Sequence, residues 1–340
     1  MADRIGRRPT IVVSLVAWSA VTWATGSATT FGELMWARTL MGISEAFYIP
    51  AALALIADHH AGSTRSRAIG VHQTAIYAGM MLGGFGGHVA DAPDLGWRFA
   101  FHVAGAAGVM YALPLAFLLP SAPVPDADAV LGTRPGVLAS VRELLSSLPF
   151  MVLVACFTLP ALAGWIVRDW MPAILKQEFG LGQGAAGVSA TLYTTIAMMV
   201  GVAAGGVMAD RWSRLTPRGR TYTSALGISL LVPSVLGVGN AGSAGVAVAF
   251  LALFGLGWGL FDCNNMPILC QLVSPRSRAT GYGIMNFVSI GCGGFADWGF
   301  GLMRDAGLPL NVCFACFGCL ALVAVGLMLW IGRGIRPVGP

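Results

Sequence analysis

The chain alternates between long apolar stretches and short polar intervals along its whole length. Crossing the hydrocarbon core of a bilayer takes about 20 residues per helix, and ten apolar stretches are long enough. They are predicted at residues 9–28, 33–57, 67–90, 98–120, 148–175, 185–209, 220–239, 243–271, 279–302 and 309–332. Backbone polar groups in lipid must be satisfied within the segment, so each stretch is predicted to be an α-helix.

Composition agrees with a membrane protein. Hydrophobic residues make up 56% of the 340 positions and charged residues only 10%, whereas soluble proteins average about 25% charged residues. Most of the 46 glycines lie inside the apolar stretches. Small residues there let helix backbones approach each other closely. We therefore predict an all-α membrane protein of about ten transmembrane helices.

Cationic residues are concentrated on one side of the predicted spans. Of the 20 lysines and arginines, only Arg98, Lys176 and Arg304 fall on the opposite side, while Arg38 and Arg168 lie within spans. The cation-rich side is expected to be cytoplasmic, which also places both termini in the cytoplasm. This asymmetry accounts for the net charge of +5, so a nucleic-acid partner has no support.

A repeated tetrapeptide indicates two related halves. Residues 1–4 read Met-Ala-Asp-Arg, and residues 208–211 read the same. A polar interval at 121–147 is predicted to be a cytoplasmic linker between an N-terminal bundle, 1–120, and a C-terminal bundle, 148–340. The second copy follows two spans of its bundle. Two further spans are therefore expected upstream of Met1 if the halves are equivalent.

This repeated loop resembles the signature loop of the major facilitator superfamily, in which two pseudo-symmetric bundles of six helices rock about a central site. The resemblance implies that the predicted spans are helices 3 to 12 of that fold. It also implies that the loop residues form a latch on the cytoplasmic side, the alternative being that the arginines only set topology. The latch residues are Asp3, Arg4, Gly6, Arg7, Arg8, Gly206, Asp210, Arg211 and Arg214.

Two charged residues, Arg38 and Glu45, lie in the interior of the second predicted span. Arg38 and Glu45 are two helical turns apart, which puts them on one face about 10.5 Å apart along the axis. Charges inside a membrane are costly and usually face a partner or a water-filled cavity. A guanidinium can bind a carboxylate or phosphate through two hydrogen bonds, while a carboxylate can carry a proton.

The pattern Arg38-x-x-x-Gly-x-x-Glu45-Ala, with Pro50 following, is similar to the fourth helix of the anion:cation symporter family. That likeness implies that Arg38 contacts an anionic substrate and that Glu45 takes part in proton coupling. The alternative is that Arg38 belongs to a fourth-helix arginine pattern shared by many proton-coupled facilitators.

The spans of the C-terminal bundle contain further charged and amide side chains. Arg168 and Asp169 are neighbours near the outer end of a span. Helical neighbours point about 100° apart, so separate partners are expected, a substrate for Arg168 and a proton for Asp169. The alternative is that they reach to the interface beside nearby tryptophans.

The segment 262–267, Asp-Cys-Asn-Asn-Met-Pro, places a carboxylate and two amides beside a proline. Proline removes a backbone hydrogen bond, and polar, broken helices at membrane depth are typical of substrate or ion sites. Asp262 is thus a second candidate for proton coupling, and Asn264 and Asn265 are candidates for substrate binding. Helix packing is the alternative.

Neutral hydrogen-bonding side chains suited to a hydroxylated solute lie in two other spans. They are Gln73, Tyr77 and Asn286. Each of them is more often a contact between helices.

Other functions have less support. No serine, cysteine or histidine stands in a setting typical of a nucleophile and base, and no phosphate-binding loop is present, so we do not expect an enzyme. The Cys313-x-x-Cys316-x-x-Cys319 run lies on an apolar helix, where small packing residues are expected rather than a metal site. Residues 79–87 are glycine-rich like the fifth-helix signature of drug and proton antiporters, but they lack its proline.

The sequence predicts a secondary transporter for symport of a small organic anion, such as a sugar acid, driven by a proton or sodium gradient without a cofactor. We expect a monomer in a bacterial inner membrane. Two alternatives remain open: a proton-coupled exporter, or a truncated, non-transporting remnant or gene-model fragment.

Overall fold

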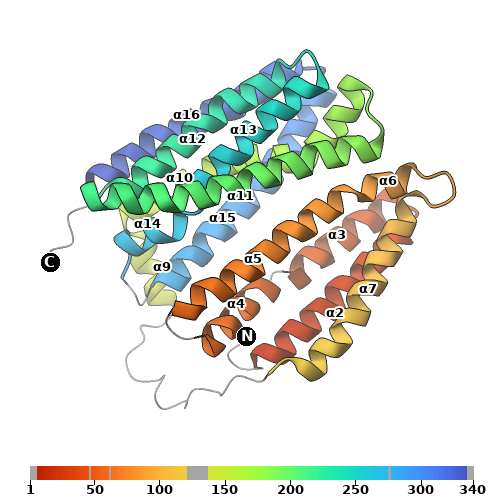
Figure 1. The fold of residues 1–340 in the computed structure, drawn as a ribbon, viewed down its shortest axis with the longest axis horizontal. Helices are drawn as coiled ribbons and strands as arrows, with labels where there is room; N and C mark the ends of the chain where they lie inside the picture. Colours follow the sequence, from red (N-terminus) through yellow and green to blue (C-terminus); the bar gives the residue numbers. More distant parts are fainter. Residues whose placement is uncertain (1–5, 46, 61–62, 121–136, 275–276, 335–340) are drawn as a thin grey trace. The chain divides into compact units, whose positions relative to one another are not determined.

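The protein is described by a computed structural model over residues 6–45, 47–60, 63–120, 137–274 and 277–334. Within these ranges every regular element is a helix. The chain divides into two compact units (Figure 1). One unit comprises residues 1–132 with 182–185, and the other comprises residues 133–181 with 186–340.

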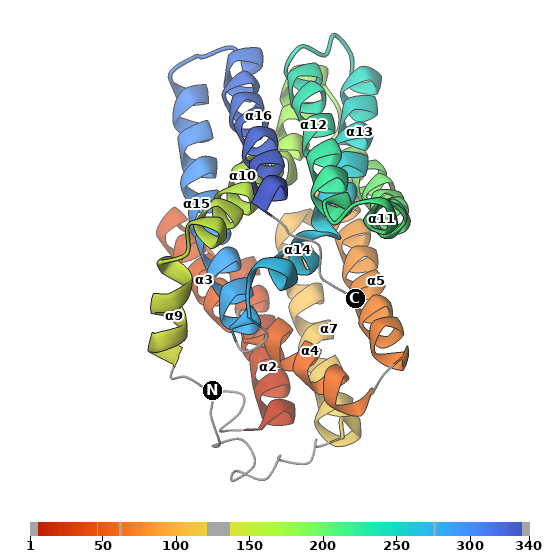
Figure 2. The same ribbon diagram turned by 90° about the vertical axis from the view of Figure 1, so that its left-hand side faces the viewer.

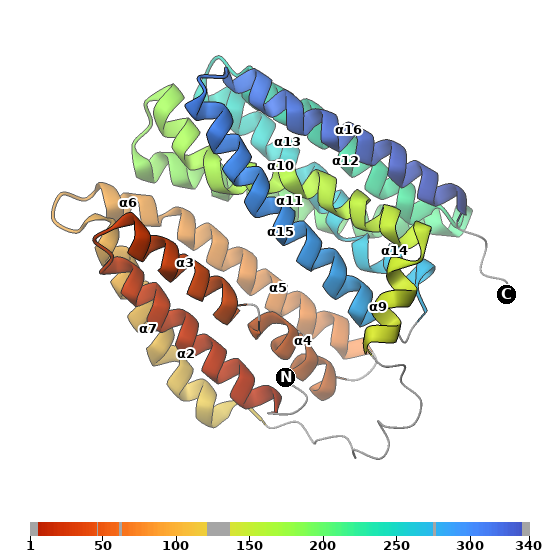
Figure 3. The same cartoon turned by 180° about the vertical axis from the view of Figure 1, so that it is seen from behind.

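The first unit is built around α2. Its helices are α2 (Arg7–Gly26), α3 (Phe31–Glu45), α4 (Tyr48–His59), α5 (Ser63–Gly84), α6 (Gly86–Asp91) and α7 (Gly96–Leu118). Helix α2 packs against α3, α4 and α7, while α5 contacts α4 and α6 (Figure 3). A small cluster of Ile11, Ala51, Ala52 and Leu55 is buried where α2 meets α4.

The second unit contains most of the buried residues. Its helices are α9 (Val137–Leu145), α10 (Leu148–Phe179), α11 (Gln183–Leu215), α12 (Gly219–Gly239), α13 (Ala244–Asp262), α14 (Asn265–Leu272), α15 (Arg278–Asp305) and α16 (Leu310–Gly334). Helix α12 lies between α13 and α16, and α10 packs against both α15 and α16 (Figure 2).

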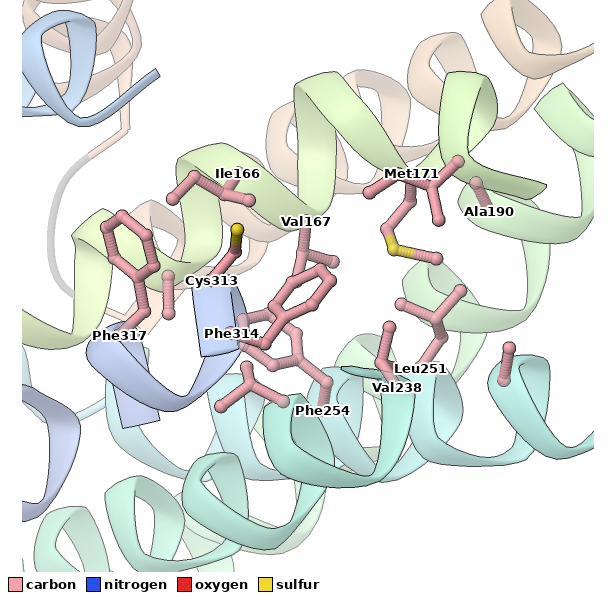
Figure 4. Packing of buried hydrophobic residues seen from close by; sticks show 14 of the residues in the cluster. Ile166, Val167, Met171, Ala190, Val238, Leu251, Phe254, Cys313, Phe314 and Phe317 are labelled. Atoms are coloured by element: carbon pink, nitrogen blue, oxygen red, sulfur yellow. The ribbon is translucent and has the colours of Figure 1, made fainter. Parts of the chain in front are cut away.

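Aromatic side chains fill the interior of the second unit. The fully buried Phe300 ring has its centroid 5.0 Å from Trp170 and 5.6 Å from Phe314. Phe254 and Phe314 belong to the same cluster (Figure 4). Lipid tails are as apolar as these side chains, so the stabilisation comes mainly from close van der Waals packing rather than from removal from water.

Alternate glycines of α13 face two different neighbours. A Cβ atom at Gly257 would lie 2.7 Å from the carbonyl oxygen of Gly227 on α12. Cβ atoms at Gly255 and Gly259 would instead collide with the backbone of α11. The apolar glycine run thus brings three helix backbones together, as the sequence predicts.

The ten predicted spans correspond to ten helices or pairs of helices. Three of them are broken: 33–57 into α3 and α4, 67–90 into α5 and α6, and 243–271 into α13 and α14. Among the described residues, seven helical segments are long and apolar enough to cross a membrane. The predicted spans 33–57, 67–90 and 279–302 correspond to helices that are shorter or more polar.

The second half of the predicted linker is helical. Residues 137–145 form α9, which packs against α10 and α15. Leu144 at its end is 3% exposed and joins the core of the second unit. This part of the interval therefore belongs to the C-terminal unit, while residues 121–136 lie outside the described part of the chain.

Candidate functional site

Arg38 and Glu45 lie on one unbroken helix of the first unit. Helix α3 runs from Phe31 to Glu45, so the two residues share a face as predicted. Both side chains are exposed. The guanidinium carbon of Arg38 lies 5.1 Å from the centroid of the Phe101 ring on α7. Among the described residues, neither Arg38 nor Glu45 has an ion-pair partner.

Glu45 is the last residue of α3, at a break in the predicted span. Helix α4 begins at Tyr48, two residues before Pro50. Proline has no N–H, so position 50 cannot donate the hydrogen bond that a continuous helix would give to the carbonyl of residue 46. The carboxylate of Glu45 is therefore located where a helix ends, rather than in the middle of a span.

Gln73 and Tyr77 lie on α5, four residues apart and hence on one face. Gln73 is exposed and Tyr77 is half-buried. Just before them, the His72 ring lies 6.2 Å from the Tyr48 ring of α4. Helix α4 thus connects the helix that carries Arg38 and Glu45 with the helix that carries Gln73 and Tyr77.

The structure gives Arg168 and Asp169 a contact with each other in addition to separate neighbours. Nε of Arg168 lies 3.6 Å from Oδ1 of Asp169, and the guanidinium also covers the Trp165 ring at 5.0 Å. The two charges partly neutralise each other, which removes the reason to expect a free anion-binding arginine here.

Asp169 has a second neighbour that we did not predict, Asp297 on α15. Their carboxyl groups are close enough to interact electrostatically. One oxygen of Asp297, Oδ1, is buried without a hydrogen-bond partner among the described residues. Asp297 is the only acidic residue in the apolar stretch 279–302, and that isolation was a signal in the sequence.

Asp262, Asn264 and Asn265 surround the break between α13 and α14. Helix α13 ends at Asp262, and Asn264 and Asn265 begin the next helix. Nδ2 of Asn265 donates to Oδ1 of Asp262 at 3.1 Å, and Nδ2 of Asn264 donates to the carbonyl of Leu260 at 3.0 Å. The structure therefore brings together the three residues predicted in this segment.

Asn286 lies near the same break, on α15. Its Nδ2 donates to the carbonyl of Tyr282 at 3.1 Å. Tyr282 in turn is close enough to Asp262 for an electrostatic interaction between the two side chains. The predicted residues of the later bundle thus fall into two groups, one around Asp169 and one around Asp262.

The predicted latch is only partly described, since Asp3 and Arg4 lie outside the described residues. Gly6 caps α2 with a φ of 93°, a conformation that favours glycine. Arg7 follows Gly6 at the start of α2, and Arg8 donates from Nη2 to the carbonyl of Ala116 on α7. These contacts lie within the first unit.

In the second copy of the loop, Asp210 pairs with an arginine that the motif does not contain. Nη2 of Arg220, at the start of α12, lies 2.9 Å from Oδ1 of Asp210. Arg211 and Arg214 are exposed on α11. A side chain at Gly206 would meet open space, so close packing does not explain that glycine.

The cysteine run does not gather metal ligands. Cys313 is buried, whereas Cys316 and Cys319 are exposed. No group of three or more histidine, cysteine, aspartate or glutamate side chains in the described ranges could hold a metal ion.

Comparison with known proteins places the chain in a family. A family model described as Major Facilitator Superfamily matches residues 1–296. An MFS-type efflux pump of Mycolicibacterium smegmatis is 27% identical over 98% of this chain and 76% of its own length. The mouse sphingosine-1-phosphate transporter SPNS2 is 25% identical, and the match covers 92% of this chain and 58% of that protein. A 3-(3-hydroxy-phenyl)propionate transporter of Escherichia coli is 25% identical over 83% of this chain and 67% of its own length.

Solved structures show the same fold. A bacterial homologue of the human lysosomal transporter Spinster superposes with a TM-score of 0.79 at 20% identity, covering 98% of this chain and 84% of that one. A D-xylose-proton symporter gives a TM-score of 0.76 at 15% identity over 96% and 81% of the two chains. The helical architecture and the match over most of the sequence agree: the chain belongs to the Major Facilitator Superfamily, whose members are multi-pass membrane transporters of small solutes and not enzymes.

Proposed function

We propose that the chain carries out proton-coupled symport of a small organic anion, with Arg38 binding the anion and Glu45 carrying the proton. The observation behind this assignment is the arrangement on α3, where an arginine and a carboxylate share one face and neither has an ion-pair partner among the described residues. An unpaired guanidinium inside a membrane protein is costly unless it meets an anion or water.

The Phe101 ring supports the role of Arg38. A guanidinium that lies over an aromatic face keeps its N–H groups at the edge of the plane, and the same edge is used for two-point binding of a carboxylate or phosphate. Two relatives are named for solutes that contain such groups. One is a 3-(3-hydroxy-phenyl)propionate transporter and the other a sphingosine-1-phosphate transporter. A carboxylate or phosphate substrate is consistent with both.

The position of Glu45 supports its coupling role, because it lies two helical turns from Arg38 on the same face of α3. At a helix end its carboxyl group is exposed and can exchange a proton with water. A carboxylate whose charge changes during the cycle alters the energy difference between the inward-open and outward-open states. This links proton binding to transport of the anion.

The assignment is tested by uptake into proteoliposomes, using 3-(3-hydroxyphenyl)propionate as the first probe and other carboxylates and sphingosine-1-phosphate as further probes. Arg38→Lys keeps the charge but loses the two-point geometry, so binding of the anion should weaken. Glu45→Gln should abolish accumulation driven by a proton gradient but spare exchange of the anion between the two sides.

Matched controls are Arg142→Lys and Glu143→Gln, because both residues are exposed on α9. Both control proteins should transport like the wild type. Normal uphill accumulation by Glu45→Gln would show that Glu45 does not carry the coupling proton.

Proton-coupled export is the second candidate, and one observation favours it. The mycobacterial relative, which matches 98% of this chain, is described as an efflux pump. The direction can be decided in inverted membrane vesicles. Acidifying the lumen should drive an exported solute inward in exchange for protons, whereas a symporter should release the solute together with protons.

A further inference from the structure

We infer that the break between α13 and α14 is a sodium-binding site formed by side-chain oxygens of Asp262, Asn264 and Asn265. All three residues lie within four positions of each other in the second unit. Arg38 and Glu45 belong to the first unit.

Two buried amide oxygens at the break have no donor. Asn264 and Asn265 are only 1% and 2% exposed, and Oδ1 of each lacks a hydrogen-bond partner among the described residues. A buried acceptor without a donor loses its hydrogen bonds to water and gains none in return, which destabilises the fold. Two of them on adjacent residues need an explanation, and a ligand that binds oxygens provides one.

The orientation of Asn265 is fixed by its neighbour. Its Nδ2 donates to Asp262 at 3.1 Å, because the amide oxygen would repel the carboxylate if the group were turned round. Oδ1 is therefore the atom of this amide that is left without a partner among the described residues. The amide of Asn264 is held in the same way by the carbonyl of Leu260.

The carboxylate at the break lacks an ion-pair partner, since no cationic side chain lies within ion-pair distance of Asp262 among the described residues. Arg220 interacts electrostatically with the neighbouring Cys263, but its ion pair is with Asp210 at 2.9 Å. An unpaired carboxylate at membrane depth costs several kcal/mol. A bound cation offsets that cost and satisfies the amide oxygens at the same time.

The backbone at the break offers one further oxygen ligand. Pro267 has no N–H, so the carbonyl of Cys263 cannot receive the bond that position 267 would give in a continuous helix. Interrupted helices in other secondary transporters bind sodium or protons with such carbonyls.

The ligand set favours a monovalent ion. The amide and carbonyl oxygens are neutral, so the single carboxylate balances one positive charge. Calcium takes six to eight oxygens, commonly from several carboxylates. A sulfur ligand is not expected at the break, because Cys263 donates its S–H to the carbonyl of Leu260 at 3.5 Å. Sodium is therefore the expected ion.

Binding is measured directly with radiolabelled sodium on the purified full chain in detergent, by a scintillation proximity assay with choline replacing sodium in the blanks. The wild type should bind sodium saturably, and unlabelled sodium should compete better than potassium. Asp262→Asn should abolish binding, and Asn264→Ala or Asn265→Ala should each weaken it at least about tenfold. Asp305→Asn, at the exposed end of α15, is the matched control and should bind like the wild type.

Folding of each variant is checked by size-exclusion chromatography and thermal unfolding. The two alanine variants keep the Asp262 charge, so they test the site even if Asp262→Asn does not fold. Absence of saturable sodium binding in the folded wild type would overturn the inference, as would unchanged binding in both alanine variants.

A coupling role for this ion rests on the proposed transport function. If it holds, an inward sodium gradient should stimulate anion uptake in the wild type, and Asn265→Ala should remove the stimulation. Sodium binding without any anion transport would contradict the proposed function and leave the ion site intact. Anion transport without sodium binding would do the reverse.

Discussion

Removing the Phe101 ring should weaken anion binding through Arg38. The guanidinium carbon lies 5.1 Å from the ring centroid. Cation–π contacts contribute about 0.5–1 kcal/mol at exposed sites, and Arg38 is exposed. At 1.4 kcal/mol per factor of ten, Phe101→Ala should raise the Kd for 3-(3-hydroxyphenyl)propionate about two- to fivefold.

The ring also packs against a neighbour on its own helix. Its centroid lies 5.8 Å from that of Trp97, with the planes at 86°, an edge-to-face contact that contributes about 0.5–1.5 kcal/mol. Phe101→Ala therefore lowers stability as well as affinity. Phe101→Tyr keeps the aromatic face and should retain wild-type affinity. Phe99→Ala removes an exposed ring from the same helix and should leave the Kd unchanged.

A double-mutant cycle separates the two effects. Anion binding is measured by isothermal titration for the wild type, Phe101→Ala, Arg38→Gln and the double variant. If the ring acts through Arg38, its removal should have no further effect on the Kd once Arg38 is absent. An equal loss of affinity in both backgrounds would refute the cation–π role and leave only a packing role.

Three stability predictions follow from the second unit, each measured by thermal unfolding in detergent. Gly257→Ala should lower the free energy of unfolding by about 1–3 kcal/mol, because its Cβ would lie 2.7 Å from the carbonyl oxygen of Gly227. Gly245→Ala, whose Cβ would meet open space, should be neutral or stabilising. Equal effects of the two substitutions would show that close backbone approach is unimportant. Phe300→Ala should lower the free energy of unfolding by about 3–5 kcal/mol, because it leaves a cavity in the buried cluster. Phe295 is 75% exposed, so Phe295→Ala should lower it little. The reverse order would contradict the buried cluster. Asp210→Asn should change stability by less than about 1 kcal/mol despite its 2.9 Å ion pair, since the Asp210 side chain is 65% exposed; a larger loss would mean that the pair is shielded from solvent.

Local pattern was enough to predict most of the helices. Apolar length placed every predicted span on a helix or helix pair, and Pro267 marked the break in 243–271 before the structure showed α13 ending at Asp262. The break after Glu45 was missed, although Pro50 carries the same signal. A proline inside an apolar stretch is ambiguous, because Pro160 and Pro172 lie within the unbroken α10.

Contacts between helices were beyond the sequence pattern. Asp262 and Asn265 are only three residues apart, on either side of the break, so closeness in the chain brings them together. Asp169 and Asp297 are on α10 and α15, and only tertiary packing determines that they meet. Asp210 and Arg220 are ten positions apart across the turn between α11 and α12, a separation that no single-helix periodicity relates.

The glycines of α13 have a mechanical consequence. Where two helix backbones touch through glycines, sliding one helix along the other would bring a carbonyl of one against a side chain of the other. Helices α11, α12 and α13 should therefore move together as one rigid unit. Bending during a transport cycle would then occur at the break where α13 ends at Asp262 and α14 begins. An ion held at that break would set its angle.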